Sequence, residues 1–147
     1  MIIGIVGSRR RNTEKDYLNL IWKIVELEHN NNTLTKKIVT GDCDEGGDKF
    51  ARKIANDSKD IELDIKYKLD PETGEKAKKP FNRCAKQLPY DYWTFVGICY
   101  ARNEEIAKEP LDYLIALVAP DRKGGTENTI KHFKRLHKDW EDKLIIL

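Results

Sequence analysis

The chain has 147 residues, which corresponds to a single domain at about 150 residues per domain. Charged residues make up 35% of the sequence, but 27 Lys and Arg against 25 Asp and Glu leave a net charge of +2, which excludes a protein whose whole surface binds nucleic acid. A hydrophobic content of 39% excludes a disordered chain, and no apolar run approaches the ~20 residues of a membrane span. We therefore expect one globular, cytoplasmic domain over residues 1–147, without a signal peptide.

Short apolar runs rich in β-branched residues alternate with longer segments of helical periodicity. This alternation is typical of an α/β fold with a parallel sheet. Near-continuous hydrophobicity predicts strands buried on both faces, whereas strict alternation over 61–67 predicts a strand at the sheet edge. The expected strands are 2–6, 37–40, 62–67, 113–118 and 143–147. With the intervening helices, they predict a Rossmann-like three-layer sandwich built on a parallel sheet of about five strands.

The first helix is expected to begin after Thr13, because Asp16 stands three residues later and completes a variant of the capping box. Its apolar residues between Tyr17 and Leu27 form a band wider than one buried face requires, so we expect a second covered face and a homodimer. Further helices are expected over roughly 48–57, after an N-cap at Asn103, and from Thr126 through Trp140.

The segment 68–89 has less regular periodicity, with three prolines and a turn signal at 70–74. Six basic residues against three acidic ones give it a charge of +3. Two interpretations remain open. The segment is either a solvated excursion from the domain or a mobile basic lid over an anionic ligand.

Cysteine and histidine usage predicts no metal site. Cys43, Cys84 and Cys99 are widely spaced and form no CxxC pair, and none of the three histidines lies near them in the sequence. We expect buried free thiols, no metal and no cofactor. Five aromatic residues are expected to pack in the core or in a dimer rather than stack on bases: Tyr90, Tyr92, Trp93, Phe95 and Tyr100.

Ligands of open parallel sheets bind beyond the carboxyl ends of the strands, where the strand order reverses. Three expected strands end in polar junctions, 7–11, 41–48 and 119–126, and two of these pair glycines with a helix start. Glycine lets backbone amides approach a phosphate, and a helix N-terminus favours an anion. Arg102, expected just ahead of a helix, can bind a phosphate with two hydrogen bonds. The predicted anion site comprises Gly7, Ser8, Arg9, Gly41, Asp42, Gly46, Gly47, Asp48, Arg102, Asn103, Gly124, Gly125 and Thr126.

Two common nucleotide motifs are absent. No Gly-Lys-Ser/Thr follows the first strand, and the sequence has no GxGxxG. The spacing therefore disfavours a P-loop NTPase and an ordinary NAD dehydrogenase.

Four short motifs occur in a fixed order: Gly7-Ser8-Arg9, a glycine- and aspartate-rich turn into 48–51, Arg102-Asn103, and Gly124-Gly125-Thr126. In this order and spacing they resemble the SLOG superfamily, over roughly residues 2–147. Its members include the DNA-processing protein DprA, the LOG phosphoribohydrolases and small stand-alone sensor-like domains, to which this chain is most similar. The resemblance implies a Rossmann-like domain that binds a nucleotide, with Arg102 at the position of the LOG active-site arginine and 124–126 as the phosphate loop.

One departure from the LOG pattern concerns catalysis. LOG enzymes carry Gly-Gly-x-Gly-Thr-x-Glu-Glu, and here Asn128 and Thr129 occupy the positions of the two glutamates, with Glu127 one residue early. Cleavage of an N-glycosidic bond needs an acid or carboxylate. The remaining catalytic candidates are Arg102, Glu127 and Asp48.

We therefore expect a nucleotide-binding or sensing domain. The first alternative is an N-glycosidic hydrolase or transferase. The second is single-stranded DNA binding, through the arginines of 9–11 and the basic segment 68–89.

Overall fold

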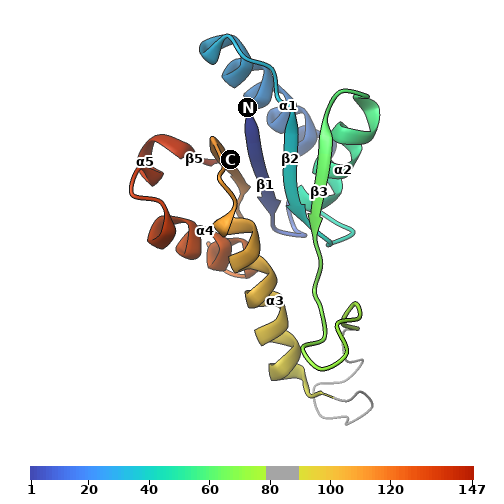
Figure 1. Cartoon of the computed structure of the whole chain (residues 1–147). Coiled ribbons are helices and arrows are strands. Elements are labelled where there is room, and N and C mark those ends of the chain that lie inside the picture. Colours follow the sequence, from blue (N-terminus) through green and yellow to red (C-terminus); the bar gives the residue numbers. More distant parts are fainter. Residues whose placement is uncertain (79–89) are drawn as a thin grey trace.

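The structure, a computed structural model, describes residues 1–78 and 90–147 (Figure 1). It contains one parallel five-stranded sheet in the order β3-β2-β1-β4-β5. The strands are β1 (Ile2–Gly7), β2 (Lys37–Gly41), β3 (Glu62–Lys66), β4 (Tyr113–Leu117) and β5 (Leu144–Ile146). In the register, Ile3 of β1 lies beside Ile38 of β2 and Tyr113 of β4. The α/β Rossmann-like fold is confirmed, and the alternating strand β3 lies at an edge, as its sequence predicts.

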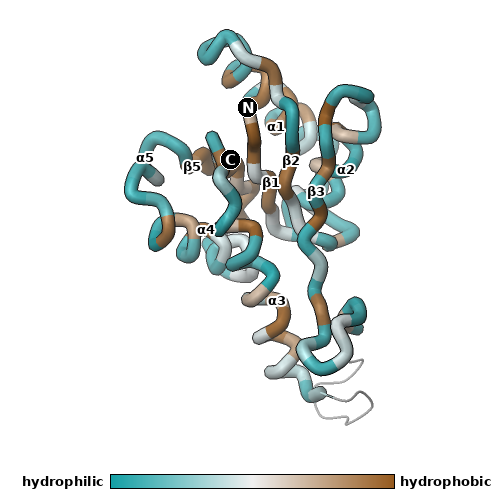
Figure 2. The backbone as a smooth tube through the Cα atoms, viewed as in Figure 1, coloured by the Kyte–Doolittle hydropathy of each residue, from teal (hydrophilic) through white to brown (hydrophobic). Residues whose placement is uncertain are grey.

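Helices cover both faces of the sheet. They are α1 (Glu14–Asn31), α2 (Gly47–Asp57), α3 (Tyr92–Lys108), α4 (Gly125–Leu136) and the short α5 (Trp140–Lys143). Because side chains alternate along a strand, Ile5 of β1 packs with α1 and α2, while its neighbour Val6 packs with α3 and α4. Figure 2 shows hydrophobic residues along the strands and again in α3. None of the helices in the described residues is long and apolar enough to cross a membrane.

The start of α1 follows the capping box that the sequence predicts. The Thr13 hydroxyl accepts a hydrogen bond from the Asp16 backbone N–H at 3.2 Å, and the Asp16 carboxylate accepts one from the Thr13 N–H at 3.2 Å. Arg11 donates to the same carboxylate at 2.7 Å. Arg11 also donates to the carbonyls of Val118 and Leu147, so it joins the start of α1 to the ends of β4 and β5.

The helix boundaries correct two predictions. Asn103 is not an N-cap, because α3 begins eleven residues earlier, where the Asp91 side chain accepts a hydrogen bond from the Thr94 N–H at 2.8 Å. Asn103 is buried in the fourth turn of the helix. The last helix does not continue to Trp140: α4 ends at Leu136 because His137 adopts extended backbone angles, and Trp140 begins α5.

The described part of the basic segment, 68–78, is irregular, as predicted. It holds a tight turn in which the Asp70 carboxylate accepts the Glu72 N–H at 2.8 Å, and an isolated bridge joins Leu69 to Lys76. The rest of the segment, 79–89, lies outside the described residues, and so do Cys84 and the open choice between an excursion and a lid. Cys43 and Cys99 are half-buried free thiols.

Candidate functional site

A cavity of about 500 Å³ lies at the carboxyl edge of the sheet, the predicted location. The loops after β1 and β4, the start of α2 and one side of α3 line it. The strand order reverses between β1 and β4; Val6 and Gly7 of β1 and the loop after β4 line the cavity. In Figure 1, α3 runs past the ends of the strands, so that its N-terminal half extends the cavity beyond the sheet.

Most predicted site residues line this cavity. They are Gly7, Ser8, Arg9, Asp48, Arg102, Asn103, Gly124, Gly125 and Thr126. Gly41, Asp42, Gly46, Gly47 and the catalytic candidate Glu127 are not among the lining residues, and each has another role. Glu127 forms an ion pair with Arg122, with N–O distances of 2.5 and 3.1 Å.

The glycines at 41, 46 and 47 provide space for packing. A Cβ at Gly41 would lie 1.5 Å from Nη1 of Arg102, and one at Gly47 would lie 2.6 Å from the backbone of β1. Gly46 has a φ of +68°, and a Cβ there would lie 2.3 Å from the Ser8 carbonyl oxygen. Gly46 and Gly47 thus let α2 approach β1 closely, and Gly41 leaves room for the guanidinium of Arg102. The ligand-binding role that the sequence assigns to these glycines stays a prediction.

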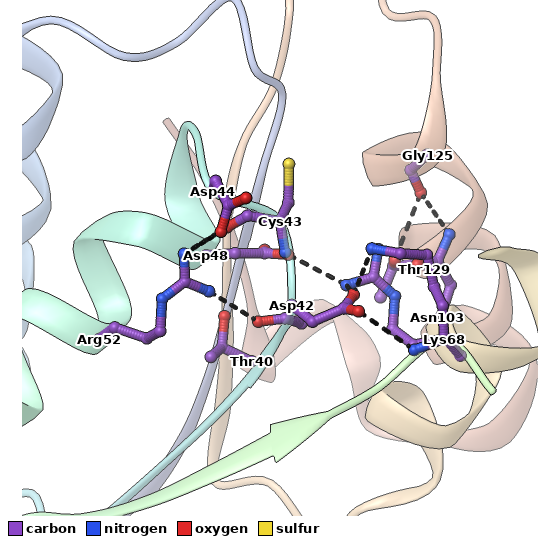
Figure 3. A network of polar contacts seen from close by, with 12 residues as sticks. Thr40, Asp42, Cys43, Asp44, Asp48, Arg52, Lys68, Asn103, Gly125 and Thr129 are labelled. Carbon is purple, nitrogen blue, oxygen red and sulfur yellow. Dashed lines mark hydrogen bonds and ion pairs between the residues drawn. The ribbon is translucent and has the colours of Figure 1, made fainter. Parts of the chain in front are cut away.

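Four side chains beneath the cavity form what we call the buried network: Asp42, Asp48, Lys68 and Arg102. Nη1 of Arg102 lies 3.0 Å from Asp48 and 3.4 Å from Asp42. Nζ of Lys68 lies 2.5 Å from Asp42 (Figure 3). These side chains are 6 to 15% exposed. Asp42 thus anchors Lys68 and Arg102, and its predicted role in ligand binding stays a prediction.

The pKa values of the two acids in the buried network are shifted in opposite directions. Burial alone would raise the pKa of Asp42, but the hydrogen bond and charge of Lys68, with the charge of Arg102, lower that pKa below its ordinary value. Burial raises the pKa of Asp48 above its ordinary value, although the charge of Arg102 and the Cys43 N–H act against it. Asp48 is therefore the cavity's candidate acid for holding a proton.

Arg102 is fixed at one end of its guanidinium. Its Nη1 contacts the two aspartates, whereas its buried Nε has no hydrogen-bond partner among the described residues. Buried N–H groups in proteins are usually paired. Arg102 thus lines the cavity while its buried Nε keeps a hydrogen-bonding capacity that the described residues do not use.

Asn103 connects α3 to the start of α4. Its Nδ2 donates to the Gly125 carbonyl at 3.1 Å (Figure 3). The same Nδ2 donates to Oδ1 of Asn128 at 3.2 Å. The N-cap residue of α4, Gly124, supplies no side-chain hydrogen bond to the helix and has a φ of +116°, which favours glycine. Gly125 and Thr126 begin the helix at the cavity. This uncapped helix start suits an anion.

The three consecutive arginines do not form a basic patch. Arg9 donates to Sγ of Cys43 at 3.3 Å, and Arg10 forms a two-pronged ion pair with Asp121 at 2.6 and 3.1 Å. Arg11 is bound to Asp16 and to two carbonyls. Of these three arginines, Arg9 and Arg10 line the cavity and Arg11 does not. The triplet is therefore a weaker support for DNA binding than its sequence indicates.

Sequence reasoning missed the part of the lining that comes from the first half of α3. Tyr92, Val96, Cys99 and Tyr100 line the cavity from α3, together with Phe95, which is also a core residue. Tyr90 instead stacks on Phe95, and Trp93 is 75% exposed. An available signal was the stretch 92–101, ten residues without a charge in a chain that is 35% charged. Lys68, Arg10 and Lys123 were also missed as lining residues.

The lining of the cavity therefore combines two kinds of side chain. Among the described lining residues are five cations (Arg9, Arg10, Lys68, Arg102 and Lys123) and one acid, Asp48. The first half of α3 adds aromatic and aliphatic side chains. Within residues 1–78 and 90–147, no group of three His, Cys, Asp or Glu side chains is placed to hold a metal ion. Comparisons with protein-family models, with curated proteins and with solved structures found no match.

Proposed function

We propose that the cavity binds a nucleotide or a nucleotide-derived molecule, and that the protein acts as a binding or sensing domain. The observation that carries this proposal is that the cavity lining combines cationic side chains with aromatic side chains of α3. A nucleotide has groups for both, a charged phosphate and an aromatic base. The position at the reversal of strand order also supports the proposal, because ligands of open α/β sheets bind there.

In this arrangement the phosphate lies against Arg9 and the start of α4. Charge-assisted hydrogen bonds from a guanidinium are stronger than neutral ones, and the amides of a helix N-terminus add a favourable dipole. The base lies against Tyr92 and Tyr100, whose rings provide apolar surface and stacking. The resemblance to the SLOG superfamily supports the same placement, because its phosphate-loop residues, 124–126, all line the cavity.

Binding without cleavage is the favoured activity. At the positions of the two LOG glutamates, Asn128 accepts a hydrogen bond from Asn103 and Thr129 donates one to the Gly125 carbonyl. Neither side chain carries a carboxylate. Glu127 is held by Arg122 and does not line the cavity.

Stability measurements with a ligand panel test the proposal. Unfolding is followed with nucleoside monophosphates, ADP-ribose, NAD, cyclic dinucleotides and, as a control for the anion alone, inorganic phosphate. A ligand at one hundred times its dissociation constant adds ~2.7 kcal/mol, or roughly 5–10 °C for a domain of this size. If none of the nucleotides raises the stability of the protein, the proposal of nucleotide binding is contradicted.

A second candidate function, cleavage or transfer at an N-glycosidic bond, rests on Asp48. A buried acid with a raised pKa at the edge of a cavity is suited to donate a proton to a leaving base. The test is chromatography of nucleoside monophosphates after long incubation with the protein. Release of free base that Asp48→Asn abolishes supports an enzyme, and absence of free base with the wild type excludes this reaction.

A further inference from the structure

Helix α1 carries two apolar stripes on opposite sides. Leu20, Ile24 and Leu27 are buried in the core, as expected for a helix that covers a sheet. Leu18, Trp22 and Val25 are 48%, 70% and 47% exposed. At about 100° per residue, Trp22 lies roughly 160° around the helix from Ile24. The core does not use this second stripe.

We infer that the outer stripe of α1 is an interface for a second copy of this chain, packed with its α1 antiparallel to the first. The stripe extends from Lys15 through Leu18, Trp22 and Val25 to His29, with alternating spacings of three and four residues. This is the spacing of residues along a helix–helix seam. A helix of 18 residues is about 27 Å long, enough for several layers of contact.

Side-chain pairing sets the register. With the two-fold axis between Ile21 and Trp22, Leu18 of one copy faces Val25 of the other, and the two Trp22 rings meet near the centre. The interface is then self-complementary, as a two-fold dimer requires. Large aromatic residues at the centre of an interface commonly contribute most to its affinity.

Charge favours the antiparallel orientation. In this register, Lys15 of one copy faces Glu28 of the other, and Glu14 faces His29, each contact occurring twice. Within the described residues, neither Lys15 nor Glu14 forms an ion pair of its own. Glu28 uses Oε1 to accept the Thr35 N–H. A parallel pair would place Lys15 against Lys15, which is repulsive.

The shape of the surface is complementary as well. A hollow of about 320 Å³ adjoins the C-terminal end of the stripe and is lined by Val25, Glu28, His29, Asn32, Thr33 and Leu34. Leu34 is 71% exposed there. Because Leu18 projects at the N-terminal end of the stripe, the antiparallel register brings it to the hollow of the second copy. One face thus carries both the projection and the hollow that receives it.

Light scattering of the full chain tests this interface. We expect twice the 17.1 kDa chain mass at tens of micromolar protein. Trp22→Glu should raise the dimer dissociation constant at least about thirtyfold, as loss of a central aromatic contact does. Trp93→Glu, on α3, is the matched control because Trp93 is 75% exposed and lies outside the stripe. Far-UV circular dichroism and the urea midpoint confirm that both variants fold.

Three results would overturn the inference: a monomeric wild type at 100 µM or so, a dimer that survives Trp22→Glu, or a dimer that Trp93→Glu dissociates instead. The register has its own test. Under mild oxidation, a mixture of Leu18→Cys and Val25→Cys chains should form a disulfide-linked pair. Neither variant alone should exceed the background of the native cysteines. A Leu18→Cys chain that links to itself would contradict the antiparallel order.

Discussion

Ion pairs border the cavity in two places, and their surroundings differ. Beneath it, the buried network holds Arg102 between Asp42 and Asp48, and Lys68 against Asp42, with all four side chains no more than 15% exposed. At its outer border, Arg10 meets Asp121 with good geometry, but the two side chains are 55% and 45% exposed. We call this second group the outer pair.

The comparison shows that geometry alone does not determine what an ion pair contributes. Water screens the outer pair and already solvates both of its members, so it adds little to the stability of the fold. The members of the buried network have lost most of their hydration, so each depends on its partner. We infer that the buried network fixes the floor of the site, whereas the outer pair leaves Arg10 available to a ligand.

Breaking the buried network should cause the largest loss of stability. Arg102→Met keeps much of the side-chain length but leaves Asp48 without its guanidinium, and removal of one member of a buried pair costs about 3–5 kcal/mol. Urea unfolding measures this loss. The double variant Arg102→Met/Asp48→Asn should recover part of it, because no carboxylate is then left uncompensated. An Arg102→Met protein as stable as the wild type would contradict the role assigned to the network.

Crowding the buried network with an added methyl group should cause the second largest loss of stability. Gly41→Ala places a Cβ 1.5 Å from Nη1 of Arg102 and 2.4 Å from Oδ2 of Asp48, so the guanidinium must move, and we expect a loss of about 2 kcal/mol. Gly97→Ala is the control: a Cβ on this helical residue of α3 meets nothing within 4 Å among the described residues. That substitution should stabilise by about 0.5–1 kcal/mol. Equal effects at both glycines would show that the contact with Arg102 is unimportant.

In side-chain exposure, the Arg11–Asp16 ion pair lies between the buried network and the outer pair: Arg11 is 22% exposed and Asp16 11%. Burial alone would raise the pKa of Asp16, but hydrogen bonds from Arg11 and Thr13 lower it below the ordinary value. The ionised Asp16 carboxylate therefore contributes fully to the stability of the fold above its unfolded pKa of about 4. This contribution is lost as the pH falls through the lower pKa of the folded state.

Asp16→Asn should thus cost about 1 kcal/mol at pH 7, as loss of a helix cap does. It should also reduce the decline of stability as pH falls below about 4, the unfolded pKa of an aspartate. Urea titrations at a series of pH values measure both effects. A variant with the wild-type decline would exclude Asp16 as a source of the pH dependence.

The outer pair should give the smallest change in stability. We expect Asp121→Asn to leave the urea midpoint within experimental error. The same substitution should strengthen the binding of an anionic ligand several-fold at low salt, because it frees Arg10 and removes a negative charge, and this gain should shrink as salt is added. Glu127→Gln, on the neighbouring ion pair outside the cavity lining, should show no such gain. A large loss of stability with Asp121→Asn would remove the distinction between the two groups.

Much of the fold could be predicted from the sequence because its strands are short apolar runs such as 2–6 and 113–118, which are followed by glycine or proline turns. The start of α3 could not, since its first half is apolar on several sides and shows no helical period to recognise. A cap signal was present in Asp91, three residues before Thr94, but the buried Asn103 offered a competing one.

The candidate site was predicted in outline because parallel strands bring their carboxyl ends to one edge. The individual roles depend on contacts between distant residues. Residue 41 has to be a glycine because Arg102, 61 positions away, occupies the space of a Cβ. Arg10 forms its ion pair with Asp121, which is 111 positions away. The aromatic wall of α3 also depends on where that helix begins. No local pattern in the sequence reports such relationships.

The most direct test of the proposed nucleotide site compares two arginine variants with the ligand that gives the largest shift in the panel. Arg9→Gln removes a cation of the cavity, and Arg135→Gln removes an exposed cation outside its lining. At a ligand concentration one hundred times the wild-type dissociation constant, the proposal predicts that stabilisation falls from about 2.7 to about 1.4 kcal/mol or less in Arg9→Gln, a tenfold loss of affinity. Arg135→Gln should keep the full value. A ligand that stabilises Arg9→Gln as strongly as the wild type would contradict the placement of the phosphate in this cavity.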